Sequence, residues 1–190
     1  MKRILKMLAA LSAICGILLC DTSVLQARNV CEREMFKASA RHGGPLAILY
    51  AVGLTETGQK SVLQPYAMNI EGKTEFPLTS KDALRRFYQA RAGGAKLIDL
   101  GCMQINHHFH GREFPSVLAM LNPSINVDYA AKFLKQLHAR EGSWTMAVAR
   151  YHAGPHNNPA QKRYVCRVIS HMVASGFGRW TSSARNFCNG

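Results

Sequence analysis

Apolar residues recur at helical spacing through most of the chain. In residues 126–140, for example, Val127, Ala130, Leu134 and Leu137 fall on one face of a helix. Reading the whole chain this way predicts helices over residues 31–41, 46–57, 80–91, 114–121, 126–140, 143–151 and 158–174, with Ser80 and Ser143 as N-caps. After the last of these helices, a tail runs through Gly176 and Gly178 to Cys188.

Two segments between these helices have a different pattern. In residues 67–78, apolar Met68, Ile70 and Phe76 flank Glu71-Gly72-Lys73, which suits a small hairpin turn. Residues 98–109 are compact and mixed, with few helix signals. We therefore expect a mainly α fold of the α+β kind: a single helical domain over residues 28–190 with a small β-hairpin lobe.

The N-terminal residues have the layout of a secretory signal peptide. Lys2, Arg3 and Lys6 precede an apolar stretch over residues 7–20, and Ala27 offers a small residue for cleavage. The stretch is shorter than the roughly 20 residues that a membrane-spanning helix needs. We expect residues 1–27 to be removed and the mature protein to reach the periplasm without stable insertion in the membrane; an uncleaved anchor is the alternative.

The net positive charge indicates which classes of binding partner are expected. The formal net charge of the chain is +13, and removing the signal region leaves +11. Such a charge favours polyanionic surroundings, which include nucleic acid, anionic membranes and a cell wall that carries carboxylates. The basic residues form no run and no aromatic platform accompanies them. Because export also conflicts with nucleic-acid binding, an acidic cell-wall polymer is the expected partner.

Cysteine usage agrees with export. Four of the six cysteines lie in the mature chain, at Cys31, Cys102, Cys166 and Cys188. An even number in an oxidising compartment predicts two disulfides. Three pairings are possible and the sequence alone does not choose between them; we expect Cys31 with Cys102 and Cys166 with Cys188.

The histidines raise the question of a metal site. They gather at His107, His108, His110, His152 and His156. The adjacent pair points in different directions, no carboxylate shares their spacing, and the cysteines lack a paired Cys-x-x-Cys motif. We expect a surface or substrate-subsite role for these histidines, and no metal.

Glu56 is the acid whose position is most suggestive. It ends a strongly apolar segment and Thr57-Gly58 follows it, so its carboxyl is expected where the core meets solvent. Burial beside apolar side chains makes a carboxyl harder to ionise, and a protonated carboxyl can donate to a leaving oxygen. A glutamate exposed at a helix end is the alternative that position alone leaves open.

Two further segments hold polar groups able to bind a sugar. Gln104 and Asn106 supply amides just after Gly101, where the backbone can approach a ligand closely. Tyr151 places a hydroxyl at the end of a predicted helix, followed by His152. Taken separately, each segment is equally compatible with a purely structural role.

Together the three segments resemble a known family. Lytic transglycosylases of the soluble-transglycosylase type carry Glu-Ser-Gly after an apolar helix, then Gly-Leu-Met-Gln, then Ala-Tyr-Asn-Ala-Gly. In the same order this chain has Leu54-Thr55-Glu56-Thr57-Gly58, Gly101-Cys102-Met103-Gln104-Ile105-Asn106 and Arg150-Tyr151-His152-Ala153-Gly154-Pro155. The resemblance covers roughly residues 31–168. Each motif alone is weak, but their ordered set is specific.

The resemblance implies a lysozyme-like fold that cleaves the β-1,4 bond between N-acetylmuramic acid and N-acetylglucosamine in peptidoglycan. Glu56 would protonate the glycosidic oxygen and then take the proton of the muramoyl 6-hydroxyl, which closes a 1,6-anhydro ring. Tyr151 would orient Glu56 or the sugar, and Met103 and Gln104 would line the cleft. The resemblance requires neither a metal nor an organic cofactor.

The chain also departs from the family pattern. Thr57 stands in place of serine, His152 in place of asparagine and Cys102 in place of leucine. The stretch between Glu56 and Gln104 is longer than is usual and resembles a lysozyme β-lobe with an insertion, from which Asn69 is expected to reach the cleft.

Asp99 leaves the reaction outcome open. As in secretion-associated transglycosylases, an aspartate two residues before the motif glycine would act as a second cleft carboxylate; a loop aspartate that bonds backbone amides is the alternative. Three hypotheses follow: a lytic transglycosylase that serves wall remodelling or a secretion or flagellar apparatus, a muramidase that uses Glu56 with Asp99, and a non-catalytic wall-binding scaffold.

Overall fold

A computed structural model describes residues 29–154 and 156–189; the predicted signal peptide, residues 1–27, lies outside this range. The helices are α1 (Val30–His42), α2 (Leu46–Thr57), α3 (Ser80–Ala92), α4 (His107–His110), the 3₁₀ helix η1 (Gly111–Glu113), α5 (Val117–Met120), α6 (Pro123–Glu141), α7 (Trp144–His152), α8 (Asn158–Ala174) and α9 (Ser182–Asn189). The strands are β1 (Met68–Ile70), β2 (Lys73–Glu75), β3 (Ile98–Leu100) and β4 (Ile105–Asn106). The mainly helical fold with a small β lobe is confirmed.

The predicted helices are present, with corrections at their ends. Ser143 caps α7 as expected, since its hydroxyl accepts from the Met146 amide at 3.2 Å. The N-cap of α3 is Thr79 and not Ser80, because the Thr79 hydroxyl accepts from the Asp82 amide at 3.1 Å. The prediction of Asn126 as the start of α6 is also wrong. That helix begins at Pro123, so Asn126 lies a turn inside it and is fully buried.

The tail forms one more helix than the sequence pattern predicted. α9 follows the segment with Gly176 and Gly178, and a disulfide between Cys166 and Cys188 ties it to α8, with the two Cα atoms 5.7 Å apart. The other disulfide joins Cys31, at the start of α1, to Cys102 in the loop after β3, with Cα atoms 5.8 Å apart. Both expected pairings are confirmed.

The β lobe is a four-stranded antiparallel sheet in the order β2-β1-β3-β4. In β1 and β3 the end residues are buried and the middle residue is half-buried, as the two-residue period of a strand requires. Met68, Ile70, Ile98 and Leu100 therefore face the core, while Asn69 and Asp99 share the opposite face. This places two polar side chains directly beside each other on adjacent strands.

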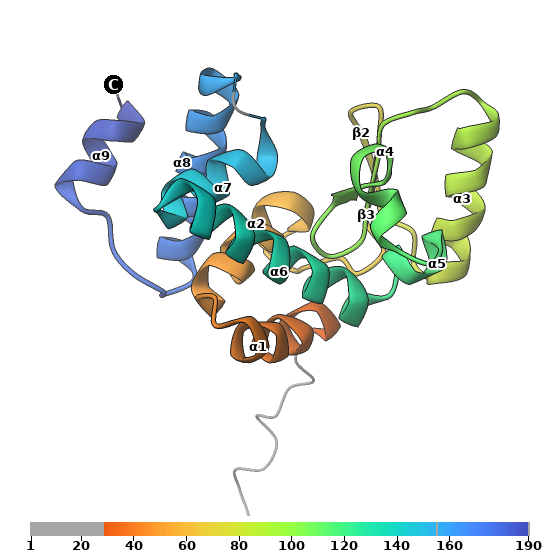
Figure 1. Cartoon of the computed structure of the whole chain (residues 1–190), viewed down its shortest axis with the longest axis horizontal. Helices are drawn as coiled ribbons and strands as arrows, with labels where there is room; N and C mark the ends of the chain where they lie inside the picture. Colours follow the sequence, from red (N-terminus) through yellow and green to blue (C-terminus); the bar gives the residue numbers. More distant parts are fainter. Residues whose placement is uncertain (1–28, 155, 190) are drawn as a thin grey trace, which may run out of the picture.

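The helical body surrounds a single apolar core. Figure 1 shows α1, α2, α6, α7 and α8 forming this body, with the sheet and α3 as a lobe to one side. Gly53 sits in the middle of α2 because an added Cβ would lie 2.4 Å from the Met35 side chain and 3.1 Å from that of Leu63. The glycine that weakens α2 as an isolated helix thus leaves room for the Met35 side chain where α2 packs on α1.

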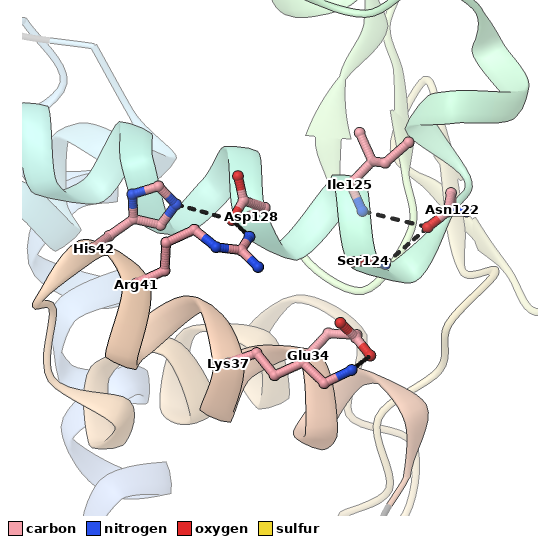
Figure 2. Close-up of polar contacts among 8 residues, drawn as sticks. All are labelled: Glu34, Lys37, Arg41, His42, Asn122, Ser124, Ile125 and Asp128. Atoms are coloured by element: carbon pink, nitrogen blue, oxygen red, sulfur yellow. Dashed lines mark hydrogen bonds and ion pairs between the residues drawn. The ribbon is translucent and has the colours of Figure 1, made fainter.

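Polar contacts fix α1 against α6. Arg41 and His42, at the end of α1, both contact the Asp128 carboxylate of α6, the histidine Nε2 at 2.9 Å (Figure 2). Asn122 caps α6 by accepting from the Ser124 and Ile125 amides. Within the described part of the chain, no helix is long and apolar enough to cross a membrane.

Candidate active site

A cleft of about 420 Å³ lies between the helical body and the β lobe. Its walls come from α2, α6, α7 and α8 on the helical side and from the four strands, the Gly101–Gln104 loop and α4 on the other. The lining residues are Thr55, Glu56, Asn69, Thr74, Asp99, Gln104, Ile105, Asn106, Phe109, His110, Phe133, Tyr151, His152 and Arg167. Most of the residues singled out from sequence are therefore brought together here.

Glu56 lies in the last turn of α2, where the apolar helix meets the cleft. The Tyr164 hydroxyl donates to Glu56 Oε1 at 2.5 Å. Burial raises the pKa of Glu56 from 4.5 to about 7, and the negative charge of Asp99 acts in the same direction. The Tyr164 hydrogen bond and the charge of Arg167 oppose this rise without cancelling it. Near neutral pH about half of the Glu56 carboxyls therefore hold a proton.

Sequence reasoning missed Tyr164. It lies on the buried face of α8 with Gln161, Val165 and Val168, at a spacing that indicates core packing. The only sequence signal was that a buried tyrosine hydroxyl needs a hydrogen-bond partner. Burial and the Glu56 charge raise the pKa of Tyr164 well above its ordinary value, so the hydroxyl stays protonated and remains a donor.

Three polar side chains form a row across the sheet. Asn69 of β1 lies opposite Asp99 of β3, which lies opposite Asn106 of β4. Asn106 Nδ2 donates to Asp99 Oδ1 at 2.6 Å, and the Asn69 amide oxygen accepts from the Gly72 amide at 2.8 Å. Burial raises the pKa of Asp99, while the hydrogen bond from Asn106 lowers it. The row gives the cleft a second carboxyl facing the helical side.

The loop after β3 carries Gln104 into the cleft in a constrained conformation. Gly101 has φ +82°, and an added Cβ there would lie 2.6 Å from Asn126 Nδ2. Gln104 has φ +47°, a region that residues with a side chain seldom occupy. Its side-chain nitrogen donates to the Ala67 and Gly101 carbonyls at 2.9 and 3.1 Å. These bonds hold the Gln104 amide at the cleft wall.

In three other predicted site residues, the side chain contacts other parts of the protein and offers no free polar group to the cleft. Tyr151 lines the cleft, but its hydroxyl donates to the Met103 carbonyl at 2.7 Å, and Glu56 is bonded by Tyr164 instead. The Met103 side chain is completely buried in the core. Thr57 is buried as well, with its hydroxyl 3.1 Å from the Gly53 carbonyl and 3.3 Å from that of Cys102. Thr57 thus joins the end of α2 to the loop.

The histidines are dispersed: His110 and His152 line the cleft, whereas His107 and His108 line a separate hollow. The His152 ring stacks on the Tyr164 ring with centroids 4.2 Å apart, and His110 Nδ1 lies 2.8 Å from the Tyr129 hydroxyl. In the residues that the structure describes, no three His, Cys, Asp or Glu side chains are grouped so that they could hold a metal ion. Burial lowers the pKa of both His110 and His152, which favours their neutral rings.

Replacing Tyr164 with phenylalanine tests the hydrogen bond to Glu56. The bond stabilises the carboxylate, so its loss should raise the pKa of Glu56 by about one pH unit above its present value. The side-chain carboxyl carbon of Glu56, followed by NMR through a pH titration, reports the midpoint. Tyr151→Phe is the matched control and should leave this midpoint in place. An identical midpoint in Tyr164→Phe and the wild type would contradict the assignment.

A carboxyl that holds its proton near neutral pH, with a second carboxyl on the opposite cleft wall, has the general acid–base chemistry used in glycoside cleavage. The sequence family described as the Transglycosylase SLT domain matches residues 34–168. The chain belongs to this family, which is of the lysozyme-like kind and acts on peptidoglycan. Comparison with curated proteins and with solved structures gave no match.

Proposed function

We propose that the protein is a lytic transglycosylase that cleaves the β-1,4 bond between N-acetylmuramic acid and N-acetylglucosamine and leaves 1,6-anhydromuramic ends. The observation that carries the proposal is Glu56: a carboxyl in the cleft of an SLT domain, with a pKa of about 7 and a fixed orientation through Tyr164. Such a group can serve as an acid and, once it has lost its proton, as a base.

In the proposed reaction Glu56 first gives its proton to the glycosidic oxygen while the bond to the muramoyl anomeric carbon breaks. The Glu56 carboxylate then takes the proton of the muramoyl 6-hydroxyl, and that oxygen bonds to the anomeric carbon. The muramoyl acetamido group helps to stabilise the cationic transition state. The carboxyl ends in its starting form, and no water is consumed. A pKa near the working pH suits both steps.

One observation favours a second candidate, a muramidase. Asp99 lies in the same cleft, and its charge contributes to the raised pKa of Glu56, so the two carboxyl groups interact electrostatically. A second carboxylate near the reacting carbon could stabilise the cation or activate a water molecule, which would give hydrolysis.

Digestion of purified sacculi, followed by mass analysis of the released fragments, separates the candidates. We expect fragments with anhydromuramic ends, which are 18 Da lighter than the corresponding reducing ends because no water is added. Fragments with reducing ends would instead identify a muramidase. Sacculi left intact would leave only the wall-binding scaffold.

We further propose that the protein works in the periplasm, where it would remodel the wall or open it for a secretion or flagellar apparatus. Support comes from the N-terminal residues, which have the pattern of a signal peptide, and from two disulfides, which form in oxidising compartments.

A further inference from the structure

A second hollow, of about 780 Å³, adjoins the cleft on the side of α8 and α9. We call it the basic pocket, and its lining residues are His152, Pro159, Ala160, Lys162, Arg163, Tyr164, Cys166, Arg167, Cys188 and Asn189. His152 and Arg167 line both the cleft and the basic pocket. A ligand could therefore extend from one into the other without crossing a barrier other than these two side chains.

The charge of the basic pocket is of one sign. Lys162, Arg163 and Arg167 line it, and among the described residues no aspartate or glutamate does. Indeed, residues 142–190 contain six lysines and arginines and no aspartate or glutamate. The ion pairs formed among the described residues include none of these three cations. Arg163 and Arg167 are four residues apart on α8, a spacing at which like charges destabilise a helix.

The basic pocket is one side chain away from the candidate acid. The hydroxyl of Tyr164 donates to Glu56, while the same ring stacks on His152 with an interplanar angle of 2°. The Arg167 guanidinium lies 5.7 Å from the Tyr164 ring centroid. The positive charges of Arg167 and Arg163 also reach His152, whose pKa they help to lower. The stack of His152 and Tyr164 thus lies where the two spaces meet.

The far wall of the basic pocket is held covalently. Cys188 and Asn189 come from α9, and the disulfide to Cys166 fixes α9 beside the cations of α8. The Lys162 ammonium lies 5.7 Å from the Phe187 ring, which holds that side chain toward α9. Both Cys188 and Asn189 lie beyond the residues matched by the family. This part of the site is an addition to the shared domain.

We propose that the basic pocket binds carboxylates of the acidic peptide attached to the muramoyl residue of the substrate. This inference rests on the proposed function and names the form of peptidoglycan that the cleft accepts. The sugar hydroxyl and acetamido groups carry no charge, so the peptide carboxylates are the natural counter-charges for Lys162 and Arg163. Charge-assisted hydrogen bonds from these cations would position the muramoyl unit against Glu56.

The test is equilibrium binding to glycan strands with their acidic peptides and to the same strands after their peptide carboxylates have been converted to neutral amides. The Glu56→Gln protein is used so that the strands stay intact. We expect it to prefer the strands with free carboxylates about five- to tenfold, from two ion pairs near the surface, and to lose the preference when Lys162→Gln and Arg163→Gln are added. The preference should also weaken as the salt concentration rises.

The matched control removes two charges elsewhere. Lys132 and Lys135 are exposed on α6 and line neither space, so Lys132→Gln with Lys135→Gln should keep the preference. Equal binding to both strands, or equal losses in the two double variants, would overturn the proposal. If the wild type leaves sacculi uncut while the preference exists and depends on Lys162 and Arg163, the proposed reaction is wrong and the binding site stands.

Discussion

Glu56→Gln is expected to lower the rate of peptidoglycan cleavage by about 10²- to 10⁴-fold, the usual contribution of a general acid–base group. Glutamine has nearly the same shape and its carbonyl can still accept the Tyr164 hydroxyl, so the variant removes the transferable proton and little else. Release of soluble fragments from sacculi measures the effect. Glu113→Gln, which changes an exposed acid outside the cleft, is the control and should retain turnover. Substantial turnover by Glu56→Gln would assign the acid elsewhere.

The same variant should be more stable than the wild type at alkaline pH. As pH rises from 4.5 to about 7, the unfolded chain releases the Glu56 proton while the folded protein retains it, so the free energy of unfolding falls. The accumulated loss is about 3 kcal/mol above pH 7, and a glutamine does not incur it. Thermal unfolding at pH 5 and pH 8 measures the difference. The melting temperatures of the two proteins should diverge only at the higher pH.

Asn126→Ala is expected to reduce the free energy of unfolding by about 3–5 kcal/mol. The completely buried Asn126 amide donates to the Leu100 and Met120 carbonyls at 2.8 and 2.9 Å and accepts from the Met103 amide at 2.9 Å. Alanine would leave all three backbone groups without their partner in the core. Because Leu100 precedes the loop that carries Gln104 and Met103 lies within it, cleavage should fall as well.

Denaturant unfolding of Asn126→Ala measures this loss, and Asn122→Ala provides the comparison. Asn122 caps the same helix from an exposed position, where replacement by alanine costs about 1 kcal/mol. Comparable losses in the two variants would show that the buried amide does not hold the loop.

Sequence periodicity was sufficient to predict the long helices, but it could not predict the tertiary contacts that complete the candidate site. The α6 pattern at Val127, Ala130, Leu134 and Leu137 repeats over several turns, so the buried face is well defined. Its start was misplaced because the regular apolar spacing begins at Val127, whereas Asn126 lies a turn inside the helix and forms three hydrogen bonds to other segments. Tertiary contacts of this kind leave no local signal.

The residues of the candidate site likewise include some that the sequence could identify and some that it could not. Glu56, Gln104 and Tyr151 could be found because they lie in short motifs with a known order. Tyr164 could not, since the i, i+3 and i+4 spacing on α8 describes a packing residue equally well. Met103 shows the opposite error. Its motif suggested a cleft residue, but its side chain fills the core and only its backbone reaches the site, through the Tyr151 hydroxyl.

The row of Asn69, Asp99 and Asn106 makes correct strand pairing a condition for both folding and function. Shifting one strand by a single residue exchanges its two faces. A misaligned β3 would carry Asp99 into the core and expose Ile98 and Leu100, which are now fully buried. Each strand has three residues or fewer, too few for backbone pairing to define alignment strongly. Only the correct alignment therefore gives a folded lobe with a working cleft wall, because a wrongly aligned sheet would lack both a stable interior and a second carboxyl.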